Sequence, residues 1–245
     1  MKGIIYKEIT LSKKQMILSG SMFLMISIIF ILMRLSMECG NLAAKEEVRG
    51  HLQDNIWIFR YLPPVVLAFL YNPSYTMYND IESHFLKFCR TTSIKMQKLI
   101  GGKVITLLII EALVYVINIT YLVLLGAVGG DSTPLSSYMI MLEIILFLCS
   151  IHLLMLFFSM IAKSRKTFEA MLVTVVTLVA VAYTPFLMKM MEKYQGREDI
   201  DILDAMRFEL APVGKYVLPL CAIMLVAGLF ICLFFGSRVL VTRKE

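Results

Sequence analysis

The sequence is poor in charged residues, and this shortage indicates the class of protein. Only 17% of its 245 residues are Asp, Glu, Lys or Arg, and 59% are hydrophobic, whereas soluble domains carry about 25% charged residues. The apolar residues are concentrated in long continuous runs that do not alternate with polar ones. Continuous runs of this kind exclude a membrane β-barrel. A single membrane domain covering residues 1–245 is expected.

Motifs that mark enzymes, nucleotide sites and metal centres are also missing. The chain has five cysteines without a C-x-x-C pair and three histidines without H-E-x-x-H, which argues against a zinc site or a disulfide framework. Gly101-Gly102-Lys103 is followed by Val104, so it lacks the leading glycine and the Ser or Thr of a phosphate-binding loop. There is no G-x-S-x-G motif either. We expect this chain to be no enzyme and to bind no cofactor itself.

Six apolar runs are long enough to cross a bilayer, for which a helix needs about 20 residues. The sequence therefore predicts an all-α fold: a polytopic membrane protein with six transmembrane helices. The predicted spans cover about residues 15–36, 56–79, 103–128, 136–162, 169–188 and 213–237. No small-residue cleavage site follows the first run, so we expect it to remain as an anchor.

The positions of Lys and Arg predict the orientation of these spans. Fifteen of the 24 basic residues lie before the first span, in the loops after the second and fourth spans, or after the sixth. The loops expected on the opposite side are 37–55, 129–135 and 189–212, and the two long ones are acidic. Because basic short loops face the cytoplasm, we expect a multi-pass protein of the plasma membrane with cytoplasmic N- and C-termini. The net charge of +6 then reflects topology, and no nucleic-acid partner is expected.

Two segments next to the predicted spans have helical character of their own. Residues 1–14 mix isoleucine with lysine and are expected to form a short interfacial helix before the chain turns into the bilayer; a solvated flank is the alternative. A small external helix is expected over residues 199–210. Pro212 and Pro219 flank the start of the sixth span, where proline ends or kinks a helix.

The loop 78–102 is long for a simple connection and is expected to hold two short amphipathic helices. The proposed caps are Asp80 for one helix and Thr92 or Ser93 for the other, and Gly101-Gly102 is expected to break the chain before the third span. The aromatic side chains of this loop, Phe85 and Phe88, would then face a partner or the lipid headgroups. The alternative is that these helices only cover the membrane surface.

Three ionisable residues lie inside the predicted spans, namely Glu111, Glu143 and His152. Such residues are costly in lipid and usually face a bundle interior or a cavity. They are candidates for the polar lining of a translocation path. The alternative is interhelical hydrogen bonding that fixes the packing of the bundle.

Two stretches of the sequence resemble the permease subunits of ABC-2-type ABC exporters. One is the opening MKGIIYKEITLSKKQ directly before a span, and the other is NDIESHFLKFCRTTSIKMQKLIGGKVI after the second span. In the family this loop runs through acidic residues, an aromatic residue, a Leu-Pro-[Ser/Thr]-[Arg/Lys] stretch and a small residue followed by Lys. Here Asp80 and Glu82 match the acids, Phe85 and Phe88 the aromatics, and Gly102-Lys103 the end; the proline is absent.

The resemblance implies a division of labour between subunits. Two six-span permeases, identical or paralogous, would pair in the lipid bilayer, each above an ATP-binding cassette ATPase subunit that holds ATP and Mg²⁺. The loop 78–102 would supply the coupling helix, and the helix over 1–14 would assist docking. The ATPase-coupling residues would be Asp80, Glu82, Phe85, Phe88 and Arg90. Small bacterial permeases of this kind export lipids, antibiotics, bacteriocins or amphipathic peptides such as phenol-soluble modulins, so an amphipathic peptide or lipid-like cargo is expected.

Two other classes of membrane protein remain open. An ion-coupled secondary transporter would be expected to show inverted repeats, and no repeat is visible between the first three and last three predicted spans. A non-transporting immunity or sensor protein is the other alternative.

Overall fold

The computed structural model describes residues 2–39, 66–67, 71–92, 94–128, 135–162, 164–171, 173–174, 177, 181 and 202–242. These residues are helical apart from short turns and connections, and no strand occurs among them. The predicted all-α class is therefore confirmed for the described part of the chain.

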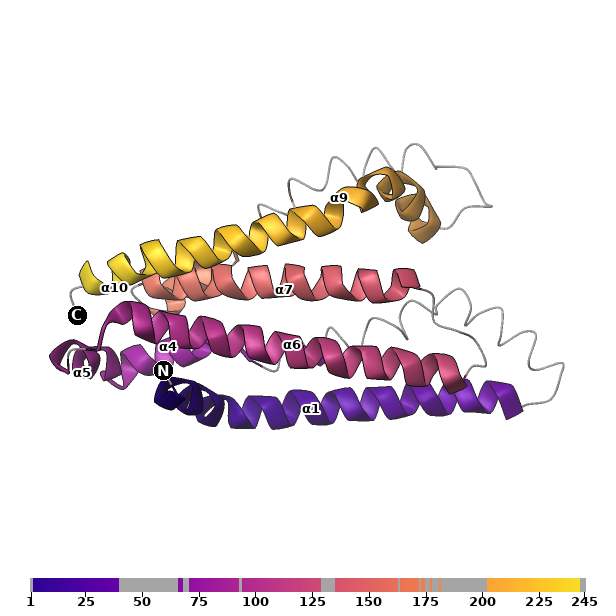
Figure 1. The fold of residues 1–245 in the computed structure, drawn as a ribbon, viewed down its shortest axis with the longest axis horizontal. Coiled ribbons are helices and arrows are strands. Elements are labelled where there is room, and N and C mark those ends of the chain that lie inside the picture. Colours follow the sequence, from indigo (N-terminus) through magenta and orange to yellow (C-terminus); the bar gives the residue numbers. More distant parts are fainter. Residues whose placement is uncertain are drawn as a thin grey trace.

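Four long helices lie lengthwise in the molecule (Figure 1). They are α1 (Lys2–Cys39), α6 (Met96–Val128), α7 (Leu135–Ile161) and α9 (Ile202–Phe230). The last of them continues through a π-helical turn, η1 (Ile231–Gly236), into α10 (Ser237–Thr242). Within the described residues, four segments are long and apolar enough to cross a membrane: Lys2–Met33, Met96–Val128, Ser137–Ile161 and Tyr216–Thr242. They coincide with the predicted first, third, fourth and sixth spans.

The predicted second and fifth spans, 56–79 and 169–188, lie mostly outside the described residues. The described helices nevertheless show how the chain is routed. α1 ends at the opposite end of the bundle from the short helix α4 (Pro73–Glu82), and α7 ends opposite the start of α9 (Figure 1). The chain therefore has to return along the bundle twice between described helices. The total of six spans stays a prediction.

The described end of the second predicted span differs from the expectation, because Tyr71 and Asn72 are not helical. α4 starts afresh at Pro73, and the Asn72 side chain accepts hydrogen bonds from the backbone N–H groups of Ser74 and Tyr75 at 3.0 and 3.3 Å. Asparagine is a preferred N-cap, and proline suits the first position of a helix. The expectation of one helix to the end of this run is wrong.

The separate interfacial helix expected for residues 1–14 is also wrong. α1 runs unbroken from Lys2 to Cys39, so that this segment prolongs the first span. Between Gly3 and Gly20 the chain contains neither glycine nor proline. Nothing in this stretch therefore interrupts the ladder of backbone hydrogen bonds.

The pair Gly101-Gly102 does not break the chain as expected. Both glycines lie inside α6, which begins at Met96. A Cβ atom built on Gly102 would stand 2.5 Å from Cγ2 of Ile4 in α1. Small residues let two helices approach closely, so this glycine serves contact between α1 and α6.

The short helices that precede α6 have different caps from those expected. Asp80 lies in the last turn of α4, whose N-cap is Asn72. The second short helix, α5 (Phe85–Thr91), follows His84, whose φ of 55° is left-handed. Thr92 is the C-cap of α5, and Ser93 lies outside the described residues.

Of the external helix expected over residues 199–210, the described residues 202–210 are helical and continue without a break into the helix of the sixth span, which is apolar enough to cross a membrane from Tyr216. α9 begins at Ile202 and continues past Pro212 and Pro219. Its first turns point away from the line of the rest of the helix (Figure 1). A bend without termination is one of the outcomes that proline produces in a helix.

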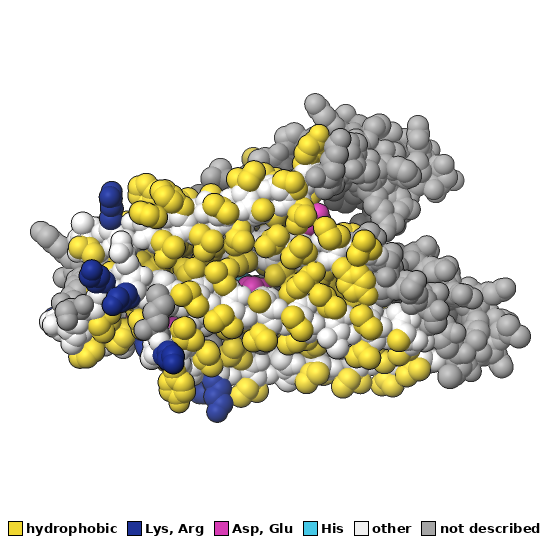
Figure 2. Space-filling view, in the orientation of Figure 1, with side chains coloured by type: hydrophobic (Ala, Val, Ile, Leu, Met, Phe, Trp, Pro, Cys, Tyr) yellow, Lys and Arg dark blue, Asp and Glu magenta, His cyan; other side chains and the backbone are white. Residues whose placement is uncertain are grey.

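Apolar side chains cover much of the face of the bundle that Figure 2 shows. Large exposed examples occur on each long helix, including Leu24, Leu113, Phe147 and Ile223. A contiguous apolar exterior marks a surface that contacts lipid or another protein, and around long apolar helices it fits a bilayer. The Lys and Arg side chains visible in this view gather toward the end where the N- and C-termini lie.

Candidate functional site

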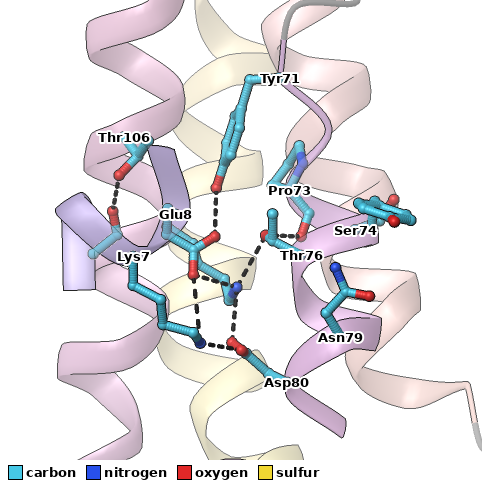
Figure 3. Close-up of polar contacts among 12 residues, drawn as sticks. Lys7, Glu8, Tyr71, Pro73, Ser74, Thr76, Asn79, Asp80 and Thr106 are labelled. Carbon is cyan, nitrogen blue, oxygen red and sulfur yellow. Dashed lines mark hydrogen bonds and ion pairs between the residues drawn. The ribbon is translucent and has the colours of Figure 1, made fainter. Parts of the chain in front are cut away.

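Four charged side chains meet at this basic end of the bundle and form what we call the ionic cluster: Lys7, Glu8, Asp80 and Lys103. Figure 3 shows Lys7, Glu8 and Asp80 pointing toward one another. The Lys103 ammonium lies 2.7 Å from Oε1 of Glu8 and 2.9 Å from Oδ2 of Asp80. Lys7 also contacts the Asp80 carboxylate. The cluster joins α1, α4 and α6, and its two positive and two negative charges balance.

Neutral groups also donate and accept hydrogen bonds in the ionic cluster. Lys103 donates to the hydroxyl oxygen of Thr76 at 3.0 Å, and the Tyr71 hydroxyl donates to Oε2 of Glu8 at 3.1 Å. The Lys103 ammonium thus hydrogen-bonds to Glu8 and Thr76 and forms an ion pair with Asp80, whose Oδ2 accepts no hydrogen bond within the described part of the chain. Lys103 and Glu8 have no solvent-accessible surface. Buried charges are tolerated when they are paired and hydrogen-bonded in this way.

The start of α4 places two of these groups. Asn72 and Pro73 begin α4. Thr76 and Asp80 are four residues apart within this helix. Side chains at this spacing lie on the same helix face. Both are buried and reach Lys103. One face of α4 therefore presents both groups to the cluster.

An aromatic contact extends the ionic cluster to the surface of α5. The Lys7 ammonium lies 3.6 Å from the centroid of the Phe85 ring, a cation–π distance. The Phe85 ring stacks on Phe88 with 6.1 Å between centroids. Phe88 is 55% exposed. A chain of direct contacts thus runs from the buried charges to an exposed aromatic side chain.

The residues that the family resemblance implies for ATPase coupling occupy both buried and exposed positions in the structure. Asp80 is buried in the ionic cluster, whereas Glu82 is exposed at the end of α4. Phe85 is half-buried and Phe88 is exposed. Arg90 belongs to α5, but its side chain lies outside the described part. Asp80 and Phe85 are brought together by Lys7.

The intramembrane candidates form a pair and a separate residue. Nδ1 of His152 in α7 lies 3.1 Å from Oε1 of Glu111 in α6, and both side chains are buried. Glu143 is half-buried, nine positions before His152 on α7. The contact between Glu111 and His152 links two spans, which agrees with the packing interpretation of these residues.

The sequence does not predict that Lys103 is buried, since the residue enters there among the cytoplasmic basic residues and as the end of the loop that resembles the ABC-2 pattern. Lys103 lies among Leu99, Ile100 and Leu107, all fully buried on α6. This spacing of three and four residues marks the buried face of a helix. Its position after two small residues, at the border of an apolar run, could have suggested a buried partner. Asn118, fully buried on α6 with no hydrogen-bond partner for its side chain, was missed as well.

The site offers no sign of metal chemistry. Among the described residues, no three His, Cys, Asp or Glu side chains gather as a metal site requires.

No family model matches the sequence, and neither a curated protein nor a solved structure matches it. We therefore infer function from the geometry of the site, in which a buried ionic cluster links short surface helices to long spans.

Proposed function

We propose that this chain is the membrane-spanning permease subunit of an ATP-driven exporter of the ABC-2 type. It would form the translocation path as a pair, with an identical or paralogous permease, and would couple to a separate ATP-binding cassette subunit. The observation that carries this proposal is the ionic cluster. It joins α4, at the basic end of the bundle, to the long helices α1 and α6.

A buried ionic link suits the transmission of movement. Removing one partner from a buried ion pair leaves an uncompensated charge and costs about 3–5 kcal/mol. Displacing α4 away from Lys103 would strand charge in the same way. Moving α1 and α6 together with α4 and α5 is therefore expected to cost less free energy than breaking the cluster. A subunit that lacks an energy source of its own needs such a link.

The outer face of the short helices offers a place for the ATPase subunit. Phe88 is exposed on α5, and Glu82 is exposed at the end of α4. Exposed aromatic side chains often anchor protein interfaces. Phe88 stacks on Phe85, and Phe85 contacts Lys7. A displacement of Phe88 by a bound partner would therefore be transmitted to the ionic cluster. ATP and Mg²⁺ would be held by the partner, and the termini would lie in the cytoplasm.

The cargo we favour is an amphipathic peptide or a lipid-like compound. The described spans are apolar over their exposed faces, and their exposed methionines, such as Met22, Met25 and Met139, provide an adaptable surface. Such a surface suits cargo with a large apolar face better than a small hydrophilic solute.

The test is reconstitution of the permease with its ATPase subunit in vesicles. Phe88→Asp is expected to keep the permease folded and to abolish the stimulation of ATP hydrolysis by cargo. Leu135→Asp is the matched control, because Leu135 is 77% exposed and begins α7 at the opposite end of the bundle (Figure 1). Normal cargo-stimulated hydrolysis in Phe88→Asp, or failure of any ATPase to co-purify, would count against the proposal.

An ion-coupled secondary transporter is the second candidate, and the buried Glu111–His152 pair favours it. Ionisable residues inside a membrane often belong to ion pathways. This candidate predicts uptake or efflux that persists without any ATPase, follows an imposed ion gradient and is lost in Glu111→Gln or Glu143→Gln. Transport that strictly requires ATP would exclude it.

A further inference from the structure

A groove of about 450 Å³ lies where α6 begins beside α10. It is at the end of the bundle where the N- and C-termini lie (Figure 1). Lys95, Met96 and Gln97 line it on one side, and Ser237, Arg238 and Val241 line it on the other. The groove combines basic, polar and apolar side chains at the border of the apolar exterior.

The groove is positively charged and contains no acidic lining residue. Lys95 and Arg238 have no carboxylate partner in the described part of the chain. Lys7, Lys103 and Arg165 behave differently, since each pairs with an acidic side chain. The two cations of the groove are therefore left to attract an anion from outside the chain.

The donors available to such an anion can be identified. The Ser237 hydroxyl donates to the backbone oxygen of Phe234 at 3.0 Å, and the Thr242 hydroxyl donates to that of Arg238 at 3.1 Å. Their protons are used within the helix. The remaining side-chain donors are the Lys95 ammonium, the Arg238 guanidinium and the Gln97 amide. A guanidinium can donate two parallel hydrogen bonds to a phosphate group.

An apolar surface continues from the groove along the same helical run. Val241 is 66% exposed and belongs to the groove lining. Phe234, about one turn before Arg238, is exposed too. An acyl chain attached to an anion in the groove would find contact on this surface, whereas free phosphate would gain nothing from it.

We propose that this groove binds the headgroup of an anionic phospholipid, with its phosphate between Lys95 and Arg238 and an acyl chain along Phe234. Basic pockets between helices on the cytoplasmic side are suited to anionic headgroups, and the basic loops predict that this end is cytoplasmic. The lipid would tie the start of α6 to the end of the last span. The proposal does not depend on the exporter function.

The test is native mass spectrometry of the full purified chain, titrated with phosphatidylglycerol or with phosphatidylcholine of the same acyl chains. The wild type is expected to retain phosphatidylglycerol preferentially. Lys95→Gln and Arg238→Gln should each weaken this retention about fivefold, and the double variant more strongly. Lys98→Gln is the matched control, because Lys98 is exposed in the first turn of α6 but does not line the groove. Its retention should equal that of the wild type.

A second measurement separates lipid from other anions. Phosphatidylglycerol should raise the unfolding temperature of the wild type and not that of the double variant, whose circular dichroism should remain unchanged. Inorganic phosphate at the same concentration should have no effect. Equal protection by inorganic phosphate would show a simple anion site. Equal lipid retention in the wild type and the double variant would overturn the proposal, as would a loss of retention in Lys98→Gln as large as that in Lys95→Gln.

Discussion

Nζ of Lys103 lies 2.7 Å from Oε1 of Glu8, although the two residues are 95 positions apart in the chain. Both side chains are fully buried, and the contact joins the first turns of α6 to the start of α1. Lysine and glutamate are almost never fully buried unless paired. Each of the two residues therefore explains the burial of the other, and the pair fixes the packing of two spans at one end of the bundle.

Replacing Lys103 should therefore destabilise the protein strongly. Lys103→Met leaves the two carboxylates of Glu8 and Asp80 with Lys7 alone, and we expect a loss of about 3–5 kcal/mol in the free energy of unfolding. Denaturant unfolding in detergent micelles measures this loss. Lys98→Met is the control, since Lys98 is exposed on the same helix, and should change stability by less than about 0.5 kcal/mol.

A compensating variant separates charge balance from packing. Lys103→Met combined with Glu8→Gln removes one charge of each sign and leaves Lys7 paired with Asp80. We expect this double variant to be more stable than Lys103→Met alone. If the losses in the free energy of unfolding from Lys103→Met and Glu8→Gln simply add in the double variant, charge balance does not stabilise the cluster.

The contact between Gly102 and Ile4 predicts a size limit at the crossing of α1 and α6. The Cβ of alanine at position 102 would stand 2.5 Å from Cγ2 of Ile4, so Gly102→Ala should destabilise the protein by about 1–3 kcal/mol. Ile4→Ala in the same chain should recover much of this loss. Gly20→Ala is the control, because a Cβ there meets no atom within 4 Å. A Gly102→Ala variant as stable as Gly20→Ala would contradict the close packing.

Some features of the fold follow from the residue pattern alone, and others depend on tertiary contacts. Length and apolarity alone predicted the four described spans, because the bilayer imposes both on any crossing helix. The breaks were harder to predict. Gly101-Gly102 predicts an interruption, yet both glycines are helical within α6, and the Asn72-Pro73 helix start is hidden inside an apolar run.

The candidate site was only partly accessible from the sequence for a related reason. The helical spacing of apolar residues in their loop indicates Phe85 and Phe88 as exposed aromatics, and the family resemblance alone implies Asp80 as a coupling residue. Neither the loop pattern nor the resemblance indicates the pairing of Lys103 with Glu8, because it depends on how α1 and α6 meet across 94 intervening residues. A basic residue at the end of a span looks the same in sequence whether it faces water or a buried carboxylate.

The thiol of Cys89 should react slowly with maleimide at neutral pH. Cys89 is fully buried in α5, and burial, together with the nearby Asp80 charge, raises the pKa of its thiol. Only the thiolate reacts, and a raised pKa means that less thiolate is present at pH 7. Labelling followed by peptide mass spectrometry should show a rate that still rises above pH 9, where an ordinary thiol is mostly ionised.

Thr91→Cys provides the comparison for this measurement, because position 91 is exposed on the same short helix. In a Cys89→Ser background its labelling should be at least tenfold faster at pH 7 and should level off at lower pH. Equal rates at the two positions would show that α5 opens freely, which is incompatible with a short helix held against the bundle.

The Glu111–His152 pair predicts an energetic coupling between α6 and α7. Their polar atoms are 3.1 Å apart inside two spans, so each single substitution leaves the other group buried without its partner. The loss in Glu111→Leu/His152→Leu should be smaller than the sum of the two single losses by about 1 kcal/mol, a typical size for a hydrogen bond between membrane helices. Denaturant unfolding of the four proteins in micelles measures the difference.

Glu143→Leu combined with His152→Leu is the matched control. The losses in the free energy of unfolding from these two substitutions should be additive, because the residues are nine positions apart on α7. Additive losses for Glu111 and His152 would mean that the contact contributes nothing to packing, and would leave the polar-lining interpretation as the reason for two buried ionisable groups in these spans.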